Sequence, residues 1–571
     1  MFIKIPSLKL IASQSVSTFK RFPLAVISAL LTMSIFIYLI QMQNPEYKNI
    51  EILIKIAFAS SLGVFMFTAL RLLGDKNPLS FVGIALIVGY YLTLPDMENP
   101  SSTIFMRHFF LILMFFIMTL WASYWKSNPT NGEFWEWTQR VIFGFLTSII
   151  FGIVLYGGLS LALFSIDKLF SLDIESKRYA QLLILVIGLF GVNYFLSQIP
   201  KNPHNLTIHT YTKIETIFAK FIITPLVIFY FLILYSYTFK ILITLNWPEG
   251  ILAWIIIIFS FVAIITYLFW TPLWSERAKK YKRFLFLALL LQTIMLAISI
   301  NIRVSDYGWT ENRYMISILG IWLFGISLYF LVLKDAKYKW IFISLTLLVF
   351  ISQVGPFSSY AISKSSQQDR LKTLLENSKP LSKKLDIQTR YEISDMINYL
   401  SKKHGLESLE PIIPKIVAKY KKENGTKNQY GFSNFATKKL GFDYVNKWDL
   451  KKDETSISIY RPQNRHLNIS GYDWIIESSY NINYKKPITK IIENSTIFYL
   501  TDKNLEVKEN NITIANISLE DFYENLLTNA KSFDFNHKDK NVSLKIILFN
   551  MFADKNGSIK NINARILYKR F

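Results

Sequence analysis

The stretch ILAWIIIIFSFVAIITYLFW, residues 251–270, contains no charged residue and decides the class of the fold. A helix needs about 20 apolar residues to cross a hydrocarbon core about 30 Å thick, and this stretch is long enough. Ten comparable stretches lie between residues 22 and 356, whereas residues 357–571 contain none. We therefore predict an all-α polytopic transmembrane helix bundle of about eleven spans over residues 1–356, followed by a C-terminal soluble α+β domain over residues 357–571.

Two of the predicted spans differ from the rest. The third is short, and the seventh is long and contains Pro225, so we expect the seventh to tilt or kink. The first span follows a basic segment and is too long for the apolar part of a signal peptide, so we expect it to be retained. The spans are 22–41, 52–73, 79–95, 104–124, 141–165, 179–199, 217–245, 251–270, 284–302, 315–333 and 340–356.

Lys and Arg residues in the short loops predict the orientation, because positive charge is retained in the cytoplasm. With a cytoplasmic N-terminus, 18 of these residues lie on the cytoplasmic side and seven on the other. The exception is loop 166–178, which places three basic residues on the outer side. We predict a multi-pass protein of the inner (cytoplasmic) membrane, with a cytoplasmic N-terminus and an extracytoplasmic C-terminal domain.

The tail changes its periodicity along the chain. Residues 358–375 and 389–403 have the apolar spacing of helices, and Pro411 and Pro414 interrupt the pattern that follows. From about residue 455 the period becomes two, as in strands. A short helix is predicted over 518–530, and strands over 455–460, 467–479, 490–500, 512–517, 542–549 and 559–568.

Composition excludes several kinds of chemistry. The chain has no cysteine, six histidines and a net charge of +23 that divides almost evenly between the two parts. The missing thiols exclude disulfides and thiolate sites, and no predicted span has Asp or Glu near its centre. His204 and His209 are five residues apart beside Pro203, a poor spacing for a metal pair. We expect no catalytic residue, metal or cofactor, and no nucleic-acid partner.

The densest polar cluster among the membrane loops is RVSDYGWTENRY, residues 303–314. It combines both charge signs, an amide and aromatic rings, so it is our candidate functional loop, which would bind a ligand or the tail domain on the outer face. The structural alternative, which we favour, makes Gly308 a turn, Thr310 a helix cap and Glu311 a favourable charge in the first turn. The candidate residues are Arg303, Asp306, Tyr307, Trp309, Glu311, Asn312 and Arg313.

A second polar cluster, GPFSSYAISKSSQQDR, joins the last predicted span to the first tail helix at residues 355–370. The Gly-Pro pair ends a membrane helix, and the hydroxyl and amide side chains suit a helix at the level of the lipid headgroups. We interpret this segment as a hinge or docking element, with a binding site as the alternative.

Three short blocks carry a resemblance to a known family. They are YGWTENRY at 307–314 with LGIW at 319–322, GPFSSYAIS at 355–363 with Arg370 and Leu371, and SGYD at 470–473. With these blocks the chain resembles the bacterial membrane-protein family known as domain of unknown function 4153. The resemblance implies a multi-span bacterial inner-membrane protein with no assigned reaction, and it carries over no catalytic residue.

Gly144, Ser148 and Gly152 recur every fourth residue in the fifth span, which predicts close helix packing. Lys55, Lys220 and Lys240 lie near span ends, from which their amines can reach the interface. These features favour packing and anchoring over catalysis.

Three functions fit the sequence. The leading hypothesis is a non-enzymatic envelope protein whose partners are the lipid bilayer and, through the C-terminal domain, another envelope component. The second is a transporter or flippase, because eleven spans exceed what anchoring requires. The third is a lipid-linked glycosyl or acyl transferase with a base among Asp96, Glu98, Asp306 and Glu311.

Overall fold

A computed structural model describes most of the chain, which separates into two compact units. Unit 1 comprises Met1–Leu385 and Ile393–Asp443, and unit 2 comprises Asp386–Glu392 and Tyr444–Phe571. The residues described are 8–42, 47–74, 77–97, 100–203, 206, 211–245, 251–273, 275–378, 385–425, 429, 431–450, 456–460, 469–481, 489–492, 496–500, 504–509, 512–518, 534–538, 542–554 and 559–571.

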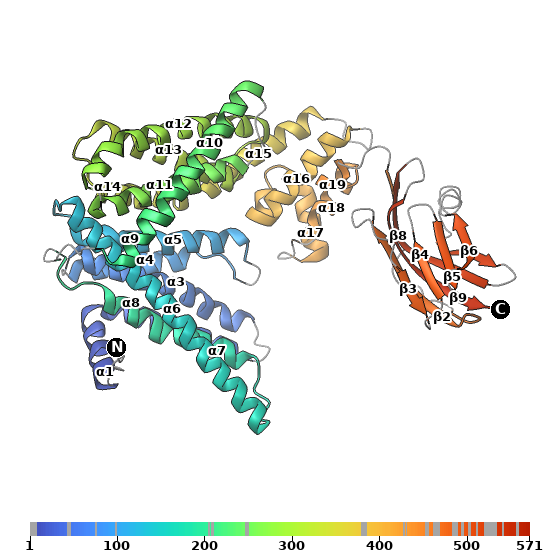
Figure 1. Cartoon of the computed structure of the whole chain (residues 1–571), viewed down its shortest axis with the longest axis horizontal. Helices are drawn as coiled ribbons and strands as arrows, with labels where there is room; N and C mark the ends of the chain where they lie inside the picture. Colours follow the sequence, from blue (N-terminus) through green and yellow to red (C-terminus); the bar gives the residue numbers. More distant parts are fainter. Residues whose placement is uncertain are drawn as a thin grey trace. The chain divides into compact units, whose positions relative to one another are not determined.

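The first part of unit 1 is a bundle of apolar helices (Figure 1). Helices form here because lipid offers the backbone no hydrogen-bond partners, so each segment must satisfy its own. η1 is a 3-10 helix, and η2 and η4 are π-helices. The elements are α1 Leu8–Arg21, α2 Pro23–Gln41, α3 Tyr47–Leu73, α4 Asn77–Thr93, α5 Ser102–Trp121, η1 Ala122–Tyr124, α6 Asn131–Phe170, α7 Lys177–Leu185, η2 Val186–Gly191, α8 Val192–Gln198, α9 Lys213–Ile217, η4 Phe218–Ile223, α10 Thr224–Thr244, α11 Ile251–Leu273, α12 Ser275–Tyr307, α13 Glu311–Val332 and α14 Lys339–Gln353.

Among the described residues, nine helices are long and apolar enough to cross a membrane. Two further apolar helices, Pro78–Thr93 and Lys339–Gln353, are shorter. Every predicted span coincides with a helical segment, and the first is present as α2. The structure therefore supports a multi-pass membrane protein with nine spans, and the predicted count of eleven goes beyond it.

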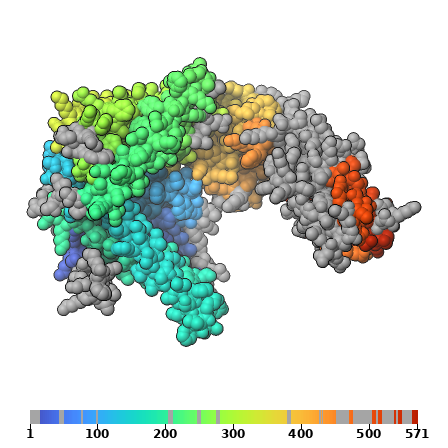
Figure 2. All heavy atoms as spheres, viewed as in Figure 1, coloured from blue at the N-terminus to red at the C-terminus, as the bar shows by residue number. Residues whose placement is uncertain are grey.

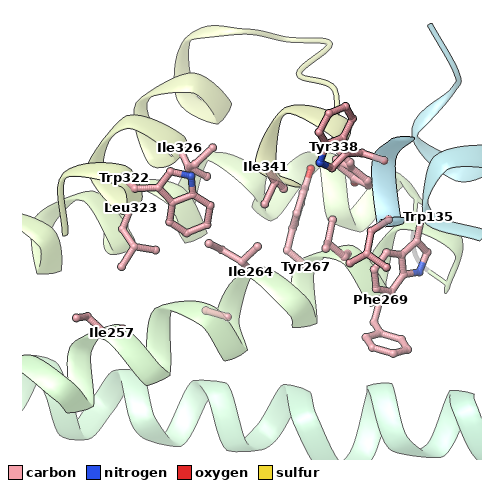
Figure 3. Close-up of a cluster of buried hydrophobic side chains, with 14 of the residues drawn as sticks. Trp135, Ile257, Ile264, Tyr267, Phe269, Trp322, Leu323, Ile326, Tyr338 and Ile341 are labelled. Carbon is pink, nitrogen blue, oxygen red and sulfur yellow. The ribbon is translucent and has the colours of Figure 1, made fainter. Parts of the chain in front are cut away.

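The bundle core centres on α11 (Figure 3). Ile264 and Tyr267 of α11 are buried there with Trp322 and Leu323 of α13 and with Tyr338. Two thirds of the apolar window of α11 is buried, whereas that of α6 has no buried residue. The helix α11 is therefore an inner helix, and most of α6 faces the surroundings of the bundle.

The span that contains Pro225 stays helical from Lys213 to Thr244 because a π-helix, η4, precedes the proline. Proline lacks an N–H and cannot complete the preceding hydrogen bond. Thr224 Oγ1 donates to the carbonyl of Ala219 over 2.6 Å and accepts a 2.7 Å bond from Trp270 Nε1. The expected irregularity at Pro225 thus takes the form of a π-helical segment stabilised by side chains.

The remaining helices of unit 1 belong to the predicted tail. The two predicted helices are confirmed as α15 and α16. Pro414 lies at the start of α17, where a missing N–H costs little. A separate apolar core, with Leu371, Ile397, Leu400 and Phe432 at its centre, joins these helices. They are α15 Ser359–Asn377, α16 Ile387–His404, the 3-10 helix η5 Leu406–Ser408, α17 Pro414–Asn424 and α18 Phe432–Leu440.

Unit 2 contains two antiparallel sheets and the short helix α19 Lys447–Leu450. One sheet has the order β1-β8-β9-β2, with β7 paired to β8, and the other has the order β3-β4-β5-β6. The strands are β1 Ser456–Tyr460, β2 Trp474–Asn481, β3 Thr489–Ile492, β4 Thr496–Leu500, β5 Asn504–Glu509, β6 Ile512–Ser518, β7 Asp534–Lys538, β8 Val542–Asp554 and β9 Ile559–Arg570.

The strand predictions needed three corrections. The predicted strand over 490–500 is two strands, β3 and β4, which pair with each other as a hairpin. The predicted strand over 467–479 begins only at Trp474, because Gly471 has a φ of +86° in a turn. Prediction also missed β5 and β7, which carry charged residues. The helix predicted over 518–530 falls on residues outside the described part, apart from Ser518, which ends β6.

The predicted domain boundary after residue 356 differs from the boundary between the compact units. The helices α15, α17 and α18, and α16 from Ile393 onward, belong to unit 1, and α15 packs against α13 and α14. The compact bundle thus extends to Asp443, well into the predicted tail. The sequence also predicts that the chain leaves the lipid after residue 356, and this stays a prediction.

Candidate functional site

The chain reverses direction within the candidate loop. α12 ends at Tyr307, Gly308 has a φ of +67°, and α13 begins at Glu311. Glycine reaches this left-handed conformation at little cost because it has no Cβ. A Cβ on Gly308 would also lie 2.9 Å from Gln367 Nε2 and 3.1 Å from Ser366 Oγ. The predicted turn is confirmed, and both its backbone and its neighbour α15 require glycine there.

Side chains of α15 satisfy the backbone groups of this turn. Ser366 Oγ accepts a 3.0 Å bond from the Trp309 N–H, and Gln367 Nε2 donates to the carbonyls of Tyr307 and Trp309 over 3.0 and 2.9 Å. Thr310 holds the N-cap position of α13 but makes no side-chain capping bond. The predicted Thr310 side-chain cap is therefore wrong. The bonds from α15 go to the Tyr307 carbonyl and to the backbone of Trp309, which precede the first turn of α13.

Glu311 binds the tail helix α16. Its Oε2 accepts a hydrogen bond from the Tyr399 hydroxyl, and its Oε1 lies 3.2 Å from His404 Nε2. The His404 side chain is 6% exposed and that of Glu311 17%, so little water reaches the pair. Burial first, and then the charge of Glu311, raise the pKa of Tyr399, so its phenol keeps the proton that it donates. Glu311 is thus a sheltered anchor for α16.

Two arginines lie over the Tyr307 ring, and a third acts on one of them through its charge. The Arg313 guanidinium carbon lies 5.4 Å from the ring centroid, and that of Arg370 lies 5.8 Å from it. Arg313 also donates to the carbonyls of Tyr307 and Gly308 over 3.1 and 2.8 Å. The charge of Arg303 acts on Arg313 at close range. Stacking on an aromatic face offsets part of the repulsion between like charges.

The C-terminal end of α16 also contacts the start of α5. Lys403 Nζ donates to Ser102 Oγ over 2.8 Å, and the Lys403 carbonyl accepts from Thr103 Oγ1 over 3.1 Å. The helix α16 is therefore bonded to two parts of the bundle that are far apart in the sequence. We call this set of contacts, from Tyr307 to Arg313 with Ser366, Gln367, Tyr399, Lys403 and His404, the docking cluster.

A second polar network lies inside the bundle around His108 of α5. His108 Nε2 lies 2.9 Å from Ser61 Oγ, and Nδ1 lies 3.0 Å from the Tyr90 hydroxyl. Ser61 in turn donates to the Phe58 carbonyl over 2.8 Å. One consistent chain of donors runs from Tyr90 through His108 and Ser61 to that carbonyl. This network was not predicted, although a histidine within an apolar span signals a functional or structural polar contact.

The predicted candidate residues separate into two groups. Tyr307, Trp309, Glu311 and Arg313 make the contacts above, whereas Asp306 and Asn312 are exposed and Arg303 is partly exposed beside Arg313. The contacts place α15 and α16 on the loop, which matches the docking alternative for it. The functional role of these seven residues stays a prediction.

Prediction missed the partners of the loop, although α15 carries a signal for them. Its buried residues recur every fourth position, and they change from polar to apolar along the helix: Ser359, Ser363, Gln367, Leu371 and Leu375. A helical face with such a stripe must contact polar groups at one end and an apolar core at the other. Tyr399 and His404 of α16 have no comparable signal in the sequence.

The other predicted sites contribute less. Among the described residues, no group of three His, Cys, Asp or Glu is close enough to hold a metal ion. His204, His209 and Glu98 lie outside the described residues, and Asp96 is exposed. The predicted close packing holds at Gly144, where a Cβ would lie 2.7 Å from Gln198 Cβ, but a Cβ at Gly152 would meet no atom within 4 Å.

Comparisons with known proteins identify the family. Residues 24–380 match the family described as Domain of unknown function (DUF4153). The chain is 27% identical over 296 residues to Uncharacterized protein PM1469 of Pasteurella multocida, covering 49% of this chain and 50% of that protein. No solved structure matches. The family match includes the bundle, the α12–α13 turn and α15, and the chain belongs to the DUF4153 family.

Proposed function

We propose that this protein is an integral protein of the bacterial inner membrane that anchors an extracytoplasmic domain for the binding or assembly of another envelope component. In this proposal α4 and α14 cross the membrane as well, which makes eleven spans. The N-terminus is cytoplasmic, and an odd number of spans places residues 357–571 on the outer side.

Charges at the two ends of the bundle support this orientation. On the predicted cytoplasmic side, basic side chains donate to loop carbonyls: Lys282 Nζ to Leu333 over 2.7 Å and Lys339 Nζ to Ser127 over 2.8 Å. In the exceptional loop 166–178, the basic residues lie beside acids instead. Lys168 lies 3.3 Å from Asp167, and Lys177 and Arg178 lie 2.6 and 3.9 Å from Glu175. Local pairing weakens the conflict of this loop with the positive-inside rule.

The docking cluster is the observation that carries the anchoring function. A tail suspended on a flexible linker would leave the α12–α13 turn and α16 without mutual bonds. Here Glu311 bonds to Tyr399 and approaches His404, and Gln367 bonds to the turn. The bundle and the tail helices therefore form one support from which the chain enters unit 2 after Asp443.

Co-purification after cross-linking in living cells tests the anchoring function. The full chain with an affinity tag is compared with a chain that ends at Asp443, which keeps unit 1. We expect one envelope component to be captured by the full chain and lost from the shortened one. Identical captures from both chains, or no specific capture, would contradict the proposal.

Thiol labelling tests the orientation, because the chain has no cysteine of its own. Ile512 is 69% exposed in β6, and Lys334 is exposed between α13 and α14. In spheroplasts, a membrane-impermeant maleimide should label Ile512→Cys directly and Lys334→Cys only after permeabilisation. The reverse pattern would invert the proposed orientation.

Lipid transport is the second candidate function, because the π-helices η2 and η4 interrupt two of the spans. Such segments occur frequently at functional sites. Proteoliposomes that contain the pure protein should then move a fluorescent phospholipid between leaflets faster than protein-free vesicles. Transferase chemistry has weaker support, since Glu311 is already bonded to Tyr399 and lies beside His404.

A further inference from the structure

A deep apolar cavity lies between α2, α3, α6 and η2. Its volume is about 590 Å³, within the range of about 300 to 1,000 Å³ that is typical of small-molecule sites. Met33, Phe65 and Phe195 line it, and Ile153 lines it while remaining 65% exposed. The cavity therefore opens on the surface of the bundle beside α6, whose side chains are visible in Figure 2.

A second cavity of about 840 Å³ continues the first towards the α6–α7 loop. On all three shared helices, the linings of the two cavities are at most one helical turn apart. The pairs are Phe36 and Ile37 on α2, Tyr156 and Leu159 on α6, and Ile184 and Leu185 on α7. We call the two cavities together the α6 groove. Its lining on α6 runs from Phe145 to Ile166, and from Ser148 to Ile166 a helix rises ~27 Å.

The groove lies between α2 and α6, which both pack against the π-helix η2. The helix α6 packs against η2 and α8, whereas α2 packs against α7 and η2. A Cβ on Gly188 of η2 would lie 2.8 Å from Met33 Cβ, so α2 and η2 are in close contact. A Cβ on Gly152 of α6 would meet no atom within 4 Å. Gly152 therefore faces open space in the groove.

The chemistry of the α6 groove changes along its length. Its deep part is apolar and contains the Ser61 hydroxyl, which is bonded to His108. The part near the α6–α7 loop carries both charge signs, with Asp173 and Glu175 beside Arg178. Arg178 donates to Gln41 Oε1 over 2.8 Å, which holds its guanidinium at this end. A hydrogen bond from Lys177 lowers the pKa of Glu175, so its carboxylate is ionised at neutral pH.

We propose that the α6 groove binds one zwitterionic phospholipid. The groove lies within the candidate spans of α2, α6 and α7–α8, so acyl chains surround it. One acyl chain fills the apolar part along Leu163 and Ile153. The headgroup lies at the charged end, with its phosphate near Arg178 and its amine near Asp173, because Lys177 already pairs with Glu175 over 2.6 Å. An anionic headgroup would meet Asp173 without an amine to offset its charge.

Native mass spectrometry of the full chain tests this site. The protein is delipidated in mild detergent and titrated with dioleoyl-phosphatidylethanolamine or dioleoyl-phosphatidylglycerol. Gly152→Leu adds a side chain to the groove at a position where a Cβ meets no atom within 4 Å. Gly157→Leu is its matched control, since Gly157 also faces open space on α6 but does not line the groove. The leucine occupies space that an acyl chain would fill, so it should exclude the lipid from the groove by size.

We expect the wild type and Gly157→Leu to retain one phosphatidylethanolamine per chain, and Gly152→Leu to bind it about tenfold more weakly. Arg178→Gln should reduce the preference for this headgroup. Unchanged thermal unfolding of Gly152→Leu shows that its fold is intact. Equal binding of phosphatidylethanolamine by the wild type, Gly157→Leu and Gly152→Leu, or no retained lipid in the wild type, would overturn the site. A preference for phosphatidylglycerol would overturn the zwitterionic headgroup. The anchoring experiment does not depend on either result.

Discussion

The bundle core around α11 and the core of the tail helices α15–α18 are both apolar, but their outer surfaces differ. On the bundle, Ile153, Phe221 and Leu232 are each more than 60% exposed. On α17, the exposed positions include Lys415 and Lys419. The tail helices thus have the inside–outside contrast of a protein in water, whereas the bundle is apolar on both sides.

This difference determines which contacts position each region. In water, burial of apolar side chains holds helices together, but in lipid the surroundings are as apolar as the core. Bundle helices therefore depend on close packing and on polar bonds such as Tyr90–His108–Ser61. The docking cluster lies between the two regions and consists of polar bonds to α15 and α16, whose apolar residues are buried in the tail core.

The largest effect is expected in the tail core. Leu400 is fully buried there, so Leu400→Ala should destabilise α15–α18 by about 2–5 kcal/mol. Ile153→Ala removes a side chain of the same size from an exposed position on α6 and should change little. Hydrogen exchange of the full chain in nanodiscs measures the change in protection caused by each substitution. Comparable loss of protection in the two variants would remove the contrast between the regions.

The next largest effect is expected at Glu311. Glu311→Gln replaces a charged acceptor with a neutral one beside Tyr399 and His404, and hydrogen bonds to charged groups contribute about 1.5–3 kcal/mol. Exchange at the C-terminal end of α16 should accelerate accordingly. Asp306→Asn alters an exposed residue of the same loop and should leave α16 unchanged. An equal effect of both variants would show that exchange in α16 depends on the charge of the loop and not on the hydrogen bond between Glu311 and Tyr399.

Substitutions at two glycines distinguish the effect of backbone strain from the effect of contact with α15. Gly308 and Gly355 both have positive φ, +67° and +82°, but only at Gly308 would a Cβ approach α15 closely. Gly355→Ala should lower the free energy of unfolding by about 1 kcal/mol through backbone strain alone. Gly308→Ala should lower it further, because its Cβ would also press on α15. Exchange rates in α15 provide the comparison. Equal costs would mean that α15 does not press on the turn.

The smallest effect at ordinary pH concerns Tyr399. Burial and then the Glu311 charge raise its pKa, so folding favours the protonated phenol. That stabilisation is complete below the unfolded pKa of about 10 and is lost as the pH rises above it. Protection of α16 should therefore fall above about pH 10 in the wild type. In Tyr399→Phe this part of the pH dependence should be absent. The same pH profile in Tyr399→Phe and the wild type would show that Tyr399 does not cause the loss of protection.

Much of unit 1 could be predicted from the sequence, because apolar length alone indicates a membrane helix. Each predicted span is helical, and the period of 3.6 located α15 and α16. Strands were harder to predict. The hairpin at 490–500 reads as one apolar run, and β5, with the sequence NLEVKE, looks too polar for a strand. Pairing with neighbouring strands stabilises such segments, and a single sequence does not show those neighbours.

The candidate loop was located correctly, but its partners were not. RVSDYGWTENRY is conspicuous because it combines both charge signs, an amide and aromatic rings within twelve residues. Tyr399 and His404 are about 90 residues away in sequence, and nothing local to them indicates a bond to Glu311. The α6 groove was not predictable either, because it depends on three helices that are apart in sequence and on the π-helix η2.

Cross-linking across the turn tests most directly whether α15 is fixed on the bundle. In this cysteine-free chain, Trp309→Cys is combined with Ser366→Cys, or with Glu376→Cys further along α15 as the control. Membranes are treated with a short bifunctional methanethiosulfonate, and linked peptides are identified by mass spectrometry. The docking cluster predicts efficient linkage of 309 to 366 and little linkage of 309 to 376. Equal linkage of both pairs, or none of the first, would contradict it.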